Sequence, residues 1–424
     1  MVYGRLYKKE KKIKMKKVYL DGAANTPLDP KVYKAMKPYL KKKFVGNSFA
    51  IHEDGIKARQ AIEEAREKIA YITGTKPEKV FFTSGATESN NWVIKATCLK
   101  ELMKPAEDRR MIILCSSVEH SSVYNACHQM ELLGFTVIEF YPYFVKKTLK
   151  LLKEYGKNTC LFCCMAVNNE TGEDFTKCIQ AVTKETKKQG ITSLIDCTQF
   201  VSMGGSFTNL SYSFSHADFY SFSAHKFYGP TGVGALIQNS ASTAELIPLL
   251  SGGAQEEGLR GGTSNTAGIV GMAKALSLTK DERNLDSHFR YLYESLETSL
   301  AYFNMDNREF YSTFIVNNDH NHQYNIVNIG YYDPDNEKRG MSLADALIAE
   351  GIECSAGSAC DSQSEGTQDA KPSRVLLNSG VDAKLVPLTV RISFTKHTTR
   401  MDLTALCKAL EKILRKPKKW EEKK

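Results

Sequence analysis

The sequence has no hydrophobic run long enough to cross a membrane. Its longest purely apolar stretch covers the eight residues 160–167 of a 424-residue chain, whereas a membrane-spanning helix needs about 20. The amino-terminal residues also lack the apolar stretch of a secretory signal peptide. We therefore expect a cytoplasmic protein with no membrane contact.

Cysteine is sparse. The 11 cysteines are an odd number at irregular spacings, which does not suit the disulfide framework of a small secreted domain. With no signal peptide, this predicts free thiols in a reducing compartment. Cys160, Cys163 and Cys164 share one apolar run, so we interpret them as core residues. We expect no metal site.

Neither sign of charge dominates strongly. The chain has 57 Lys and Arg against 48 Asp and Glu, a net charge of +9. Much of this excess lies in the lysine-rich ends, residues 1–17 and 415–424, which we interpret as solvated extensions. A contact of these ends with a nucleic acid or an anionic membrane is the alternative, and we expect neither partner. Apolar residues make up 42% of the chain and charged residues 25%, which excludes a mainly disordered chain.

Short apolar runs alternate with amphipathic stretches through the middle of the chain. The predicted strands are 79–83, 111–115, 135–140, 159–167, 193–196, 217–222 and 233–238. The predicted helices are 88–98, 121–133 and 176–189. Strands that alternate with helices predict an α/β fold whose sheet is mostly parallel and covered on both faces.

The last third of the chain has a different rhythm and predicts a second, smaller α+β domain. We place the large domain at 18–275 and the small domain at 276–424. Residues 1–17 form a basic extension, and residues 18–30 are expected to pack on the small domain. The segment 354–371, rich in Ser, Asp, Gln and Gly, is expected to be an exposed loop.

Polar residues that directly follow apolar strands are candidates for ligand binding, because open α/β sheets bind ligands at the carboxyl ends of their strands. Residues 83–89 (TSGATES) follow one strand and precede a helix. They suit a phosphate cradle or an ordinary helix N-cap. Asp196 ends another strand, and its carboxylate needs a partner. A cationic ring nitrogen, a helix cap or an internal salt bridge would each supply one.

Two further residues could carry covalent chemistry. Lys226 lies in a turn between two strands, beside His225. Such a lysine can be a Schiff-base nucleophile or an ordinary surface lysine. Cys360 lies in the predicted loop. Its thiol can be a nucleophile or redox group, or an idle surface thiol.

With these sites in this order, the chain resembles the cysteine desulfurases. These are pyridoxal 5′-phosphate enzymes of the class-V aminotransferase family. The motifs that carry the resemblance are YLDGAANTP, GNSFAIHEDG, TSGATESNN, SVEHSSV, AVNNETG, IDCTQ, SFSAHKFYGPTGVGAL, GLRGGTSN, CSAGSAC and VRISF. They extend from about residue 18 to about 414, nearly the whole chain. The resemblance implies the fold-type-I transferase architecture, and GSAC resembles the long-loop group I branch.

The resemblance also implies a set of cofactor-binding residues. They are Ala86, Thr87, His120, Asn169, Asp196, Gln199, Ser223, His225, Lys226 and Thr263. Lys226 would hold the cofactor covalently, Asp196 would keep its ring nitrogen protonated, and His120 would stack on the ring. Thr263 would reach the phosphate of the other subunit, which implies a homodimer.

The implied reaction converts L-cysteine to L-alanine and leaves the sulfur as a persulfide on Cys360. Lys226 or His120 would move the α-proton, while Arg391, with Asn169 nearby, would bind the substrate carboxylate. The sulfur would then pass to an acceptor protein in iron–sulfur cluster assembly or tRNA thiolation. The stretch between Cys360 and Pro372 is about five residues longer than the usual pattern, which leaves the acceptor open.

Two other classes of function stay open at this point. One is another enzyme on the same fold, a selenocysteine lyase or a class-V aminotransferase, and a transaminase would not need the thiol of Cys360. The other is a catalytically degenerate binding or scaffold protein, which would not bind the cofactor.

Overall fold

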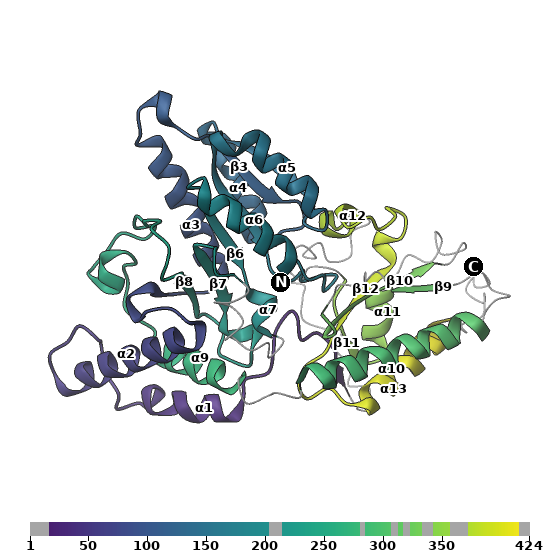
Figure 1. Ribbon diagram of the computed structural model, residues 1–424. Coiled ribbons are helices and arrows are strands. Elements are labelled where there is room, and N and C mark those ends of the chain that lie inside the picture. The colour runs from purple at the N-terminus through teal and green to yellow at the C-terminus, as the bar shows by residue number, and fades with distance from the viewer. Residues whose placement is uncertain are drawn as a thin grey trace, which may run out of the picture.

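A seven-stranded sheet with the strand order β2-β8-β7-β6-β5-β3-β4 forms the centre of the larger part of the chain (Figure 1). The computed structural model describes residues 17–202, 214–279, 285–306, 313–316, 323–332, 342–356 and 372–414. The seven strands are β2 (Val80–Thr83), β3 (Ile112–Ser116), β4 (Thr136–Phe140), β5 (Thr159–Met165), β6 (Thr192–Asp196), β7 (Phe219–Ser223) and β8 (Gly234–Gln238). Strand β8 runs in the opposite direction to the other six strands, which are parallel to one another. The predicted, mostly parallel sheet is confirmed.

Helices cover both faces of this sheet. They are α1 (Pro30–Met36), α2 (Glu53–Thr73), α3 (Ala86–Leu102), α4 (Ser121–Gln129), α5 (Val145–Tyr155), α6 (Thr176–Lys188), α7 (Thr198–Ser202) and α9 (Thr266–Thr279). Alternate side chains of a strand point to opposite faces. Accordingly, Phe162 and Cys164 of β5 pack with α5, α6 and α9, whereas Leu161 and Cys163 pack with α3 and α4.

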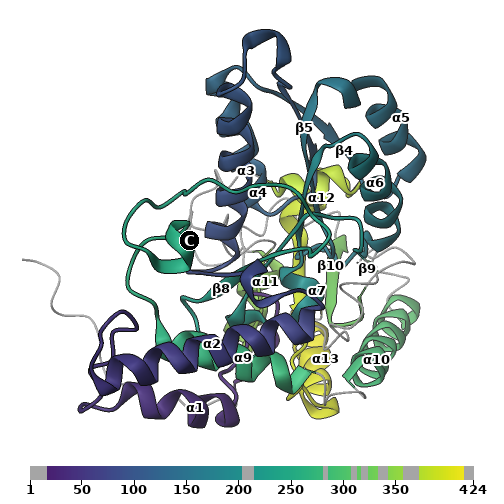
Figure 2. The same ribbon diagram turned by 60° about the vertical axis from the view of Figure 1, so that its left-hand side comes forward.

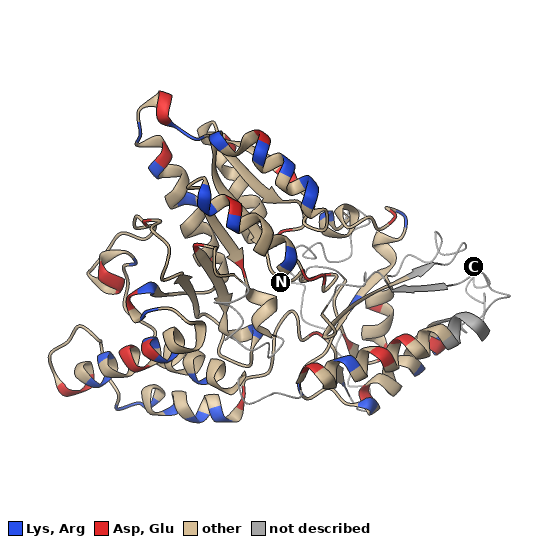
Figure 3. Cartoon of the chain, viewed as in Figure 1, with Lys and Arg blue, Asp and Glu red and all other residues tan. Residues whose placement is uncertain are grey.

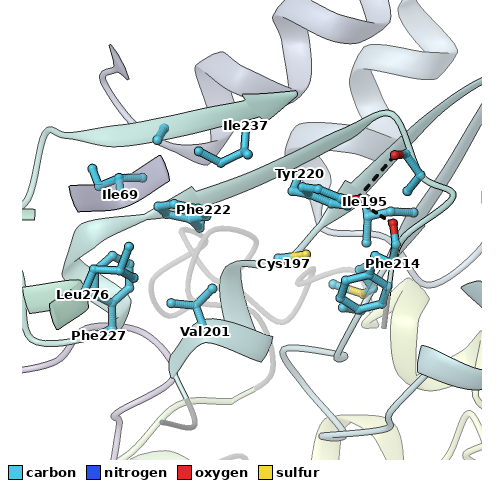
Figure 4. Close-up of a cluster of buried hydrophobic side chains, with 14 of the residues drawn as sticks. Ile69, Ile195, Cys197, Val201, Phe214, Tyr220, Phe222, Phe227, Ile237 and Leu276 are labelled. Carbon is cyan, nitrogen blue, oxygen red and sulfur yellow. Dashed lines mark hydrogen bonds between the residues drawn. The ribbon is translucent and has the colours of Figure 1, made fainter. Parts of the chain in front are cut away.

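The first of these cores is rich in aromatic side chains. Phe222 and Phe227 meet edge to face with ring centroids 5.8 Å apart, and Figure 4 shows them beside Val201 and Leu276. The hydroxyl of Tyr220 donates to the carbonyl of Phe214, so this polar atom keeps a partner inside the core. The core fixes the base of the turn that follows β7.

The outer faces of α5 and α6 are strongly basic (Figure 3). Their solvent-exposed lysines are Lys146, Lys147, Lys150, Lys153, Lys177, Lys184, Lys187 and Lys188. Leu152 and Ile179 lie on the opposite, buried faces of these helices. This amphipathic pattern explains why both stretches fold as helices against the sheet.

The carboxyl-terminal third packs around a core of its own. Its elements are β9 (Thr313–Val316), β10 (Ile326–Tyr332), β11 (Ile352–Glu353), β12 (Thr389–Ser393), α10 (Leu285–Asp306), α11 (Leu343–Ala349), α12 (Arg374–Asn378) and α13 (Arg400–Leu414). Strands β12, β10 and β9 form an antiparallel sheet, and α10 packs beside α13 (Figure 2). The division at residue 275 stays a prediction.

The amino-terminal segment crosses between the two parts. Strand β1 (Val18–Tyr19) pairs in parallel with β11, and Leu20 is buried in the carboxyl-terminal core. A few residues later, the backbone N–H of Thr26 donates to the carbonyl of His225. Residues 20–26 therefore lie beside the turn that holds Lys226.

The predicted core cysteines are confirmed. Cys160, Cys163 and Cys164 are all buried. The prediction of an exposed loop is wrong at its first residue, because Cys354 is buried with the apolar side chains of the carboxyl-terminal core, and this burial raises the pKa of its thiol to about 12. Cys360 lies outside the described residues. Within the described part of the chain, every helix is too short or too polar to cross a membrane.

Candidate active site

A cavity of about 180 Å³ lies at the carboxyl ends of the parallel strands. Strands β3, β5, β6 and β7 run in the same direction, so the residues that follow them meet at one edge of the sheet. Ten of the twelve predicted site residues line this cavity. They are Ala86, Thr87, His120, Asn169, Asp196, Gln199, Ser223, His225, Lys226 and Arg391.

Lys226 reaches the cavity from the turn after β7. Its Nζ donates to the carbonyl oxygens of Ala23 and Ala24, at 2.6 and 2.9 Å. These carbonyls belong to the amino-terminal segment that joins the two parts of the chain. Lys226 is therefore half-buried in the cavity wall, and the interpretation as a surface lysine is wrong.

Asp196 ends β6 and is only 5% exposed. Its Oδ2 accepts from Nδ2 of Asn90 at 2.9 Å, and its Oδ1 accepts from the backbone N–H of Thr198 at 2.9 Å. The second contact is a helix cap at the start of α7, one of the alternatives left open by the sequence. The cap and the position in the cavity coexist, because each carboxylate oxygen has room for more than one donor.

His120 is the N-cap residue of α4. Its Nδ1 accepts from the backbone N–H of Ser122 at 3.1 Å and lies 2.9 Å from the Ser122 hydroxyl. Because Nδ1 is an acceptor in this arrangement, the neutral ring carries its proton on Nε2. The hydroxyl of Ser122 also accepts from Asn90, so one asparagine connects His120 with Asp196.

The predicted phosphate-binding residues gather where α3 begins. The hydroxyl of Ser223 accepts from the backbone N–H of Ala86 at 2.7 Å, and Thr87 follows in the first turn of the helix. Strand β8 can pass close to this turn because residue 234 is glycine. A Cβ at Gly234 would lie 2.6 Å from Cα of Gly85. The start of a 17-residue helix attracts an anion.

His225 lies at the same end of the cavity. Burial, and then the charge of Lys226, lower the pKa of its ring to about 4. The ring is therefore uncharged at neutral pH. Its Nδ1 lies 3.0 Å from Oδ1 of Asn25, an oxygen that only accepts, so the neutral ring carries its proton on Nδ1.

Arg391 is almost fully buried, with 2% of its surface exposed. Its Nη2 forms an ion pair with Asp21 Oδ1 at 2.9 Å, and its Nη1 donates to the carbonyl of Asn169 at 2.8 Å. Asp21 also accepts from the hydroxyl of Ser355. Within the described part of the chain, Nε of Arg391 and Oδ1 of Asn169 are buried without a hydrogen-bond partner.

Gln199 lies in the cavity wall, on α7. Its Nε2 donates to the carbonyl of Ala23 at 2.9 Å, the same carbonyl that Lys226 contacts. Thr263 does not line the cavity; it is exposed to solvent. It lies three residues after Arg260, whose guanidinium pairs with Glu88 at the start of α3.

Sequence reasoning did not single out Asn90, Asp21 or Glu119. Each stands inside a quoted motif but contacts a residue that is distant in sequence. Glu119 is fully buried and accepts from the backbone N–H of Met165 at 2.6 Å. Burial, and then the charge of Asp196, raise the pKa of its carboxyl to about 8.

We expect Glu119 to make the protein less stable as the pH rises. Its raised pKa means that the folded protein keeps, between about pH 4.5 and pH 8, a proton that the unfolded chain releases. Rising pH therefore favours unfolding across this window, by up to a few kcal/mol. Glu119→Gln should remove this dependence, since the amide oxygen can still accept the Met165 N–H. Thermal unfolding at pH 5 and pH 8.5 would measure it.

The exposed Glu107→Gln is the matched control and should follow the wild-type pH profile. If the melting temperature falls by the same amount in Glu119→Gln and in the wild type between the two pH values, Glu119 does not hold a proton in the folded state.

Known proteins resemble this chain over nearly its whole length. Residues 18–406 match the class-V aminotransferase family. A protein of Dictyoglomus turgidum named cysteine desulfurase IscS is 38% identical over 406 residues, which cover 95% of each chain. The protein of that name from Rickettsia bellii is 31% identical over 95% of this chain and 93% of its own.

Solved structures agree with these relatives. A NifS-like protein superposes with a TM-score of 0.77 at 29% identity, covering 94% of this chain and 99% of its own. The protein SspA, solved in complex with cysteine, superposes with a TM-score of 0.70 at 31% identity, covering 90% and 100%. The chain therefore belongs to the cysteine desulfurases, pyridoxal 5′-phosphate enzymes of the class-V aminotransferase family.

Proposed function

We propose that this chain removes sulfur from L-cysteine by means of pyridoxal 5′-phosphate bound in the 180 Å³ cavity. One observation carries the proposal: the amine of Lys226 and the buried carboxylate of Asp196 line the same cavity. A carbonyl group and a protonated pyridine nitrogen are the complementary partners of an amine and a carboxylate. Asp196 ends β6 and Lys226 lies in the turn after β7, and these strands are parallel neighbours in the sheet.

The residues of the cavity fit the cofactor. The hydroxyls of Thr87 and Ser223 and the first turn of α3 offer donors to a phosphate. Oδ1 of Asn169, buried without a hydrogen-bond partner in the described part of the chain, suits a polar ligand, because buried polar atoms are rarely left unpaired. When bound, the cofactor supplies an electron-withdrawing ring that accepts the electron pair left at the α-carbon.

The residues of the chain prepare this chemistry. Asp196 is held by Asn90 and by the start of α7, so its negative charge stays where a ring nitrogen would need it. Lys226 provides the amine that binds the cofactor and takes the α-proton. His120 would stack on the bound ring, and it can hold a proton at Nε2 because its Nδ1 accepts the capping hydrogen bond of α4.

Arg391 binds the substrate carboxylate. Two of its guanidinium nitrogens already contact Asp21 and Asn169, which orients the planar group rigidly. Three of its five N–H donors are left for a ligand, and one of them, on the buried Nε, has no partner among the described residues. The substrate carboxylate therefore meets donors whose position is set before the substrate arrives.

Cys360 receives the sulfur. Its thiolate attacks the sulfur of the bound substrate, a sulfur–sulfur bond forms, and the carbon–sulfur bond breaks. The electron pair of the broken bond stays with the β-carbon of the substrate. This carbon takes up a proton, and the product is L-alanine. One L-cysteine and one enzyme thiol thus give one L-alanine and one enzyme persulfide, which passes to an acceptor protein.

A homodimer in the reducing cytosol is the expected working form. Thr263 is exposed and outside the cavity of its own chain, as suits a residue that reaches a neighbouring phosphate. The side chains of Val45 and Ile51, shortly before α2 in the sequence, are 70% and 92% exposed. Exposed apolar side chains suit a subunit contact. The ten cysteines in the described part of the chain are all free thiols, which suits a reducing compartment.

Incubation of the cofactor-loaded protein with L-cysteine and dithiothreitol tests this function. We expect L-alanine and sulfide in equal amounts, because each carbon–sulfur cleavage yields one of each. Without dithiothreitol, the first turnover should give one L-alanine per chain and leave its sulfur on the chain as a persulfide, because release of sulfide needs a reductant.

The rival activities give different products. An aminotransferase would consume a 2-oxo acid and form no sulfide, and a selenocysteine lyase would release selenide from L-selenocysteine while turning over L-cysteine poorly. A scaffold protein would stay colourless when mixed with pyridoxal phosphate. Any of these results would contradict the proposed function.

A further inference from the structure

The turn between β3 and α4, residues 117–120, presents His120 to the cavity and is held from outside by Arg374. Nη1 of Arg374 donates to the carbonyl of Ser117, and Nη2 donates to the carbonyl of Glu119 at 2.6 Å. Glu119 directly precedes His120. A guanidinium offers parallel donors in a rigid plane, which lets one side chain hold two carbonyls in a fixed relation.

The same guanidinium contacts the chain on the other side of His120. Its central carbon lies 3.6 Å from the ring centroid of Tyr124, a cation–π contact. Tyr124 lies one helical turn after His120, and its backbone N–H donates to the carbonyl of His120 at 3.0 Å. Its hydroxyl donates to Glu139 on β4 at 2.8 Å. Arg374 therefore contacts both the backbone before His120 and the helix after it.

Arg374 is itself anchored at the start of α12. The hydroxyl of the preceding Ser373 donates to Oε2 of Glu170 at 2.6 Å and accepts from the backbone N–H of Leu376. Nδ2 of Asn378, at the end of the helix, donates to the carbonyl of Ser117 at 2.9 Å. Four hydrogen bonds and the cation–π contact therefore dock this short element of the carboxyl-terminal part onto residues that neighbour the cavity wall.

We propose that Arg374 is a positioning residue that sets the orientation of His120 for the desulfuration reaction. The inference rests on the proposed function and adds a residue to it that does not line the cavity. The Nδ1 of His120 accepts from the backbone N–H of Ser122, so the ring is tied to the first turn of α4 and moves with the backbone of the turn. Arg374 fixes that backbone.

Loss of the guanidinium should therefore affect turnover more than binding. Without it the two carbonyls turn towards water, and the ring of His120 moves with the turn. A displacement of about 1 Å in a catalytic group can cost about 100-fold in rate. The substrate carboxylate is bound by Arg391 on another wall of the cavity, so the KM for L-cysteine should change little.

Two variants of the cofactor-loaded enzyme test the proposal. In Arg374→Met the apolar stem is kept and both donors are lost, and we expect kcat to fall about 10- to 100-fold with KM within about threefold of the wild-type value. In Arg374→Lys the charge is kept but the planar fork is lost, so kcat should lie between the two. The pH titration of the cofactor absorption should also shift, because His120 stacks on the ring.

A further measurement needs neither cofactor nor activity. In the cofactor-free protein, amide hydrogen exchange of a peptide that spans 117–125 should be faster in Arg374→Met than in the wild type. The matched control is Arg290→Met, which removes a guanidinium stacked on Tyr324 at 4.6 Å, away from the cavity. The control should match the wild type in kcat, in the absorption titration and in exchange of this peptide.

The outcomes separate the two proposals. If wild-type enzyme forms no alanine and sulfide, the proposed function fails, whereas the exchange and absorption data still report on Arg374. If Arg374→Met keeps kcat within twofold and shows the wild-type absorption titration, Arg374 does not position His120. Where Arg374→Met does not fold, the same comparison made on Arg374→Lys decides.

Discussion

Cys360→Ala should abolish the release of sulfide from L-cysteine, with a fall of at least about 1000-fold. The reaction needs a thiolate that can reach the substrate sulfur. In the described part of the chain the cysteines are buried, apart from the half-buried Cys407. Cys354, the other cysteine of CSAGSAC, has a thiol pKa raised to about 12 by burial, so it is almost entirely protonated at neutral pH.

The measurement for Cys360 combines two readouts. Sulfide is assayed in the presence of dithiothreitol, and persulfide on the chain is detected by mass spectrometry of the intact protein. The matched control is Cys354→Ala, which removes the neighbouring core thiol and should still form a persulfide. The absorption of the bound cofactor should be the same in Cys360→Ala and in the wild type. Sulfide release at the wild-type rate by Cys360→Ala would disprove the mechanism.

Lys226→Ala should lower kcat by at least about 1000-fold, because the lysine both binds the cofactor and moves the α-proton. The variant should still fold, since the side chain of Lys226 is only half-buried and its contacts are with the carbonyls of Ala23 and Ala24. Cofactor affinity should also fall, while Asp196 and the start of α3 continue to bind the ring and the phosphate without the covalent link.

Reduction with borohydride gives a direct readout for Lys226. In the wild type, reduction should fix the cofactor to the peptide that contains Lys226, as a mass increase found after digestion. Lys226→Ala should show no such peptide. The control Lys34→Ala, at an exposed lysine of α1, should be labelled like the wild type. If the mass increase is found on a different lysine, the assignment of Lys226 is wrong.

The fold could largely be predicted from local patterns. Strands such as β5, with all seven residues buried, read as continuous apolar runs because both faces of a parallel sheet are covered. The pattern was less informative in the carboxyl-terminal third. There β1 and β11 have two residues each and form only by pairing with each other across more than 300 residues, which no local periodicity can indicate.

The candidate site could be predicted in part. Asp196, Lys226 and the residues 83–89 stand at strand ends, and parallel strands bring such ends together, so their meeting in one cavity follows from the order of strands and helices. Cys354 shows the limit of the same reasoning. A stretch of small and polar residues predicted exposure, but the core that contains Cys354 also includes Val18, Val390 and Phe394, which are distant in sequence.

The sequence by itself determined the class of fold, the family and the set of residues at the strand ends, because these depend on residue order and short-range periodicity. Only the tertiary structure decided which residues orient that set. Asn90 donates to both Asp196 and Ser122. Asp21 pairs with Arg391, and Arg374 donates to a carbonyl of the turn that carries His120. Each of these contacts joins residues more than 30 positions apart in the sequence. Such contacts form only when the chain has packed.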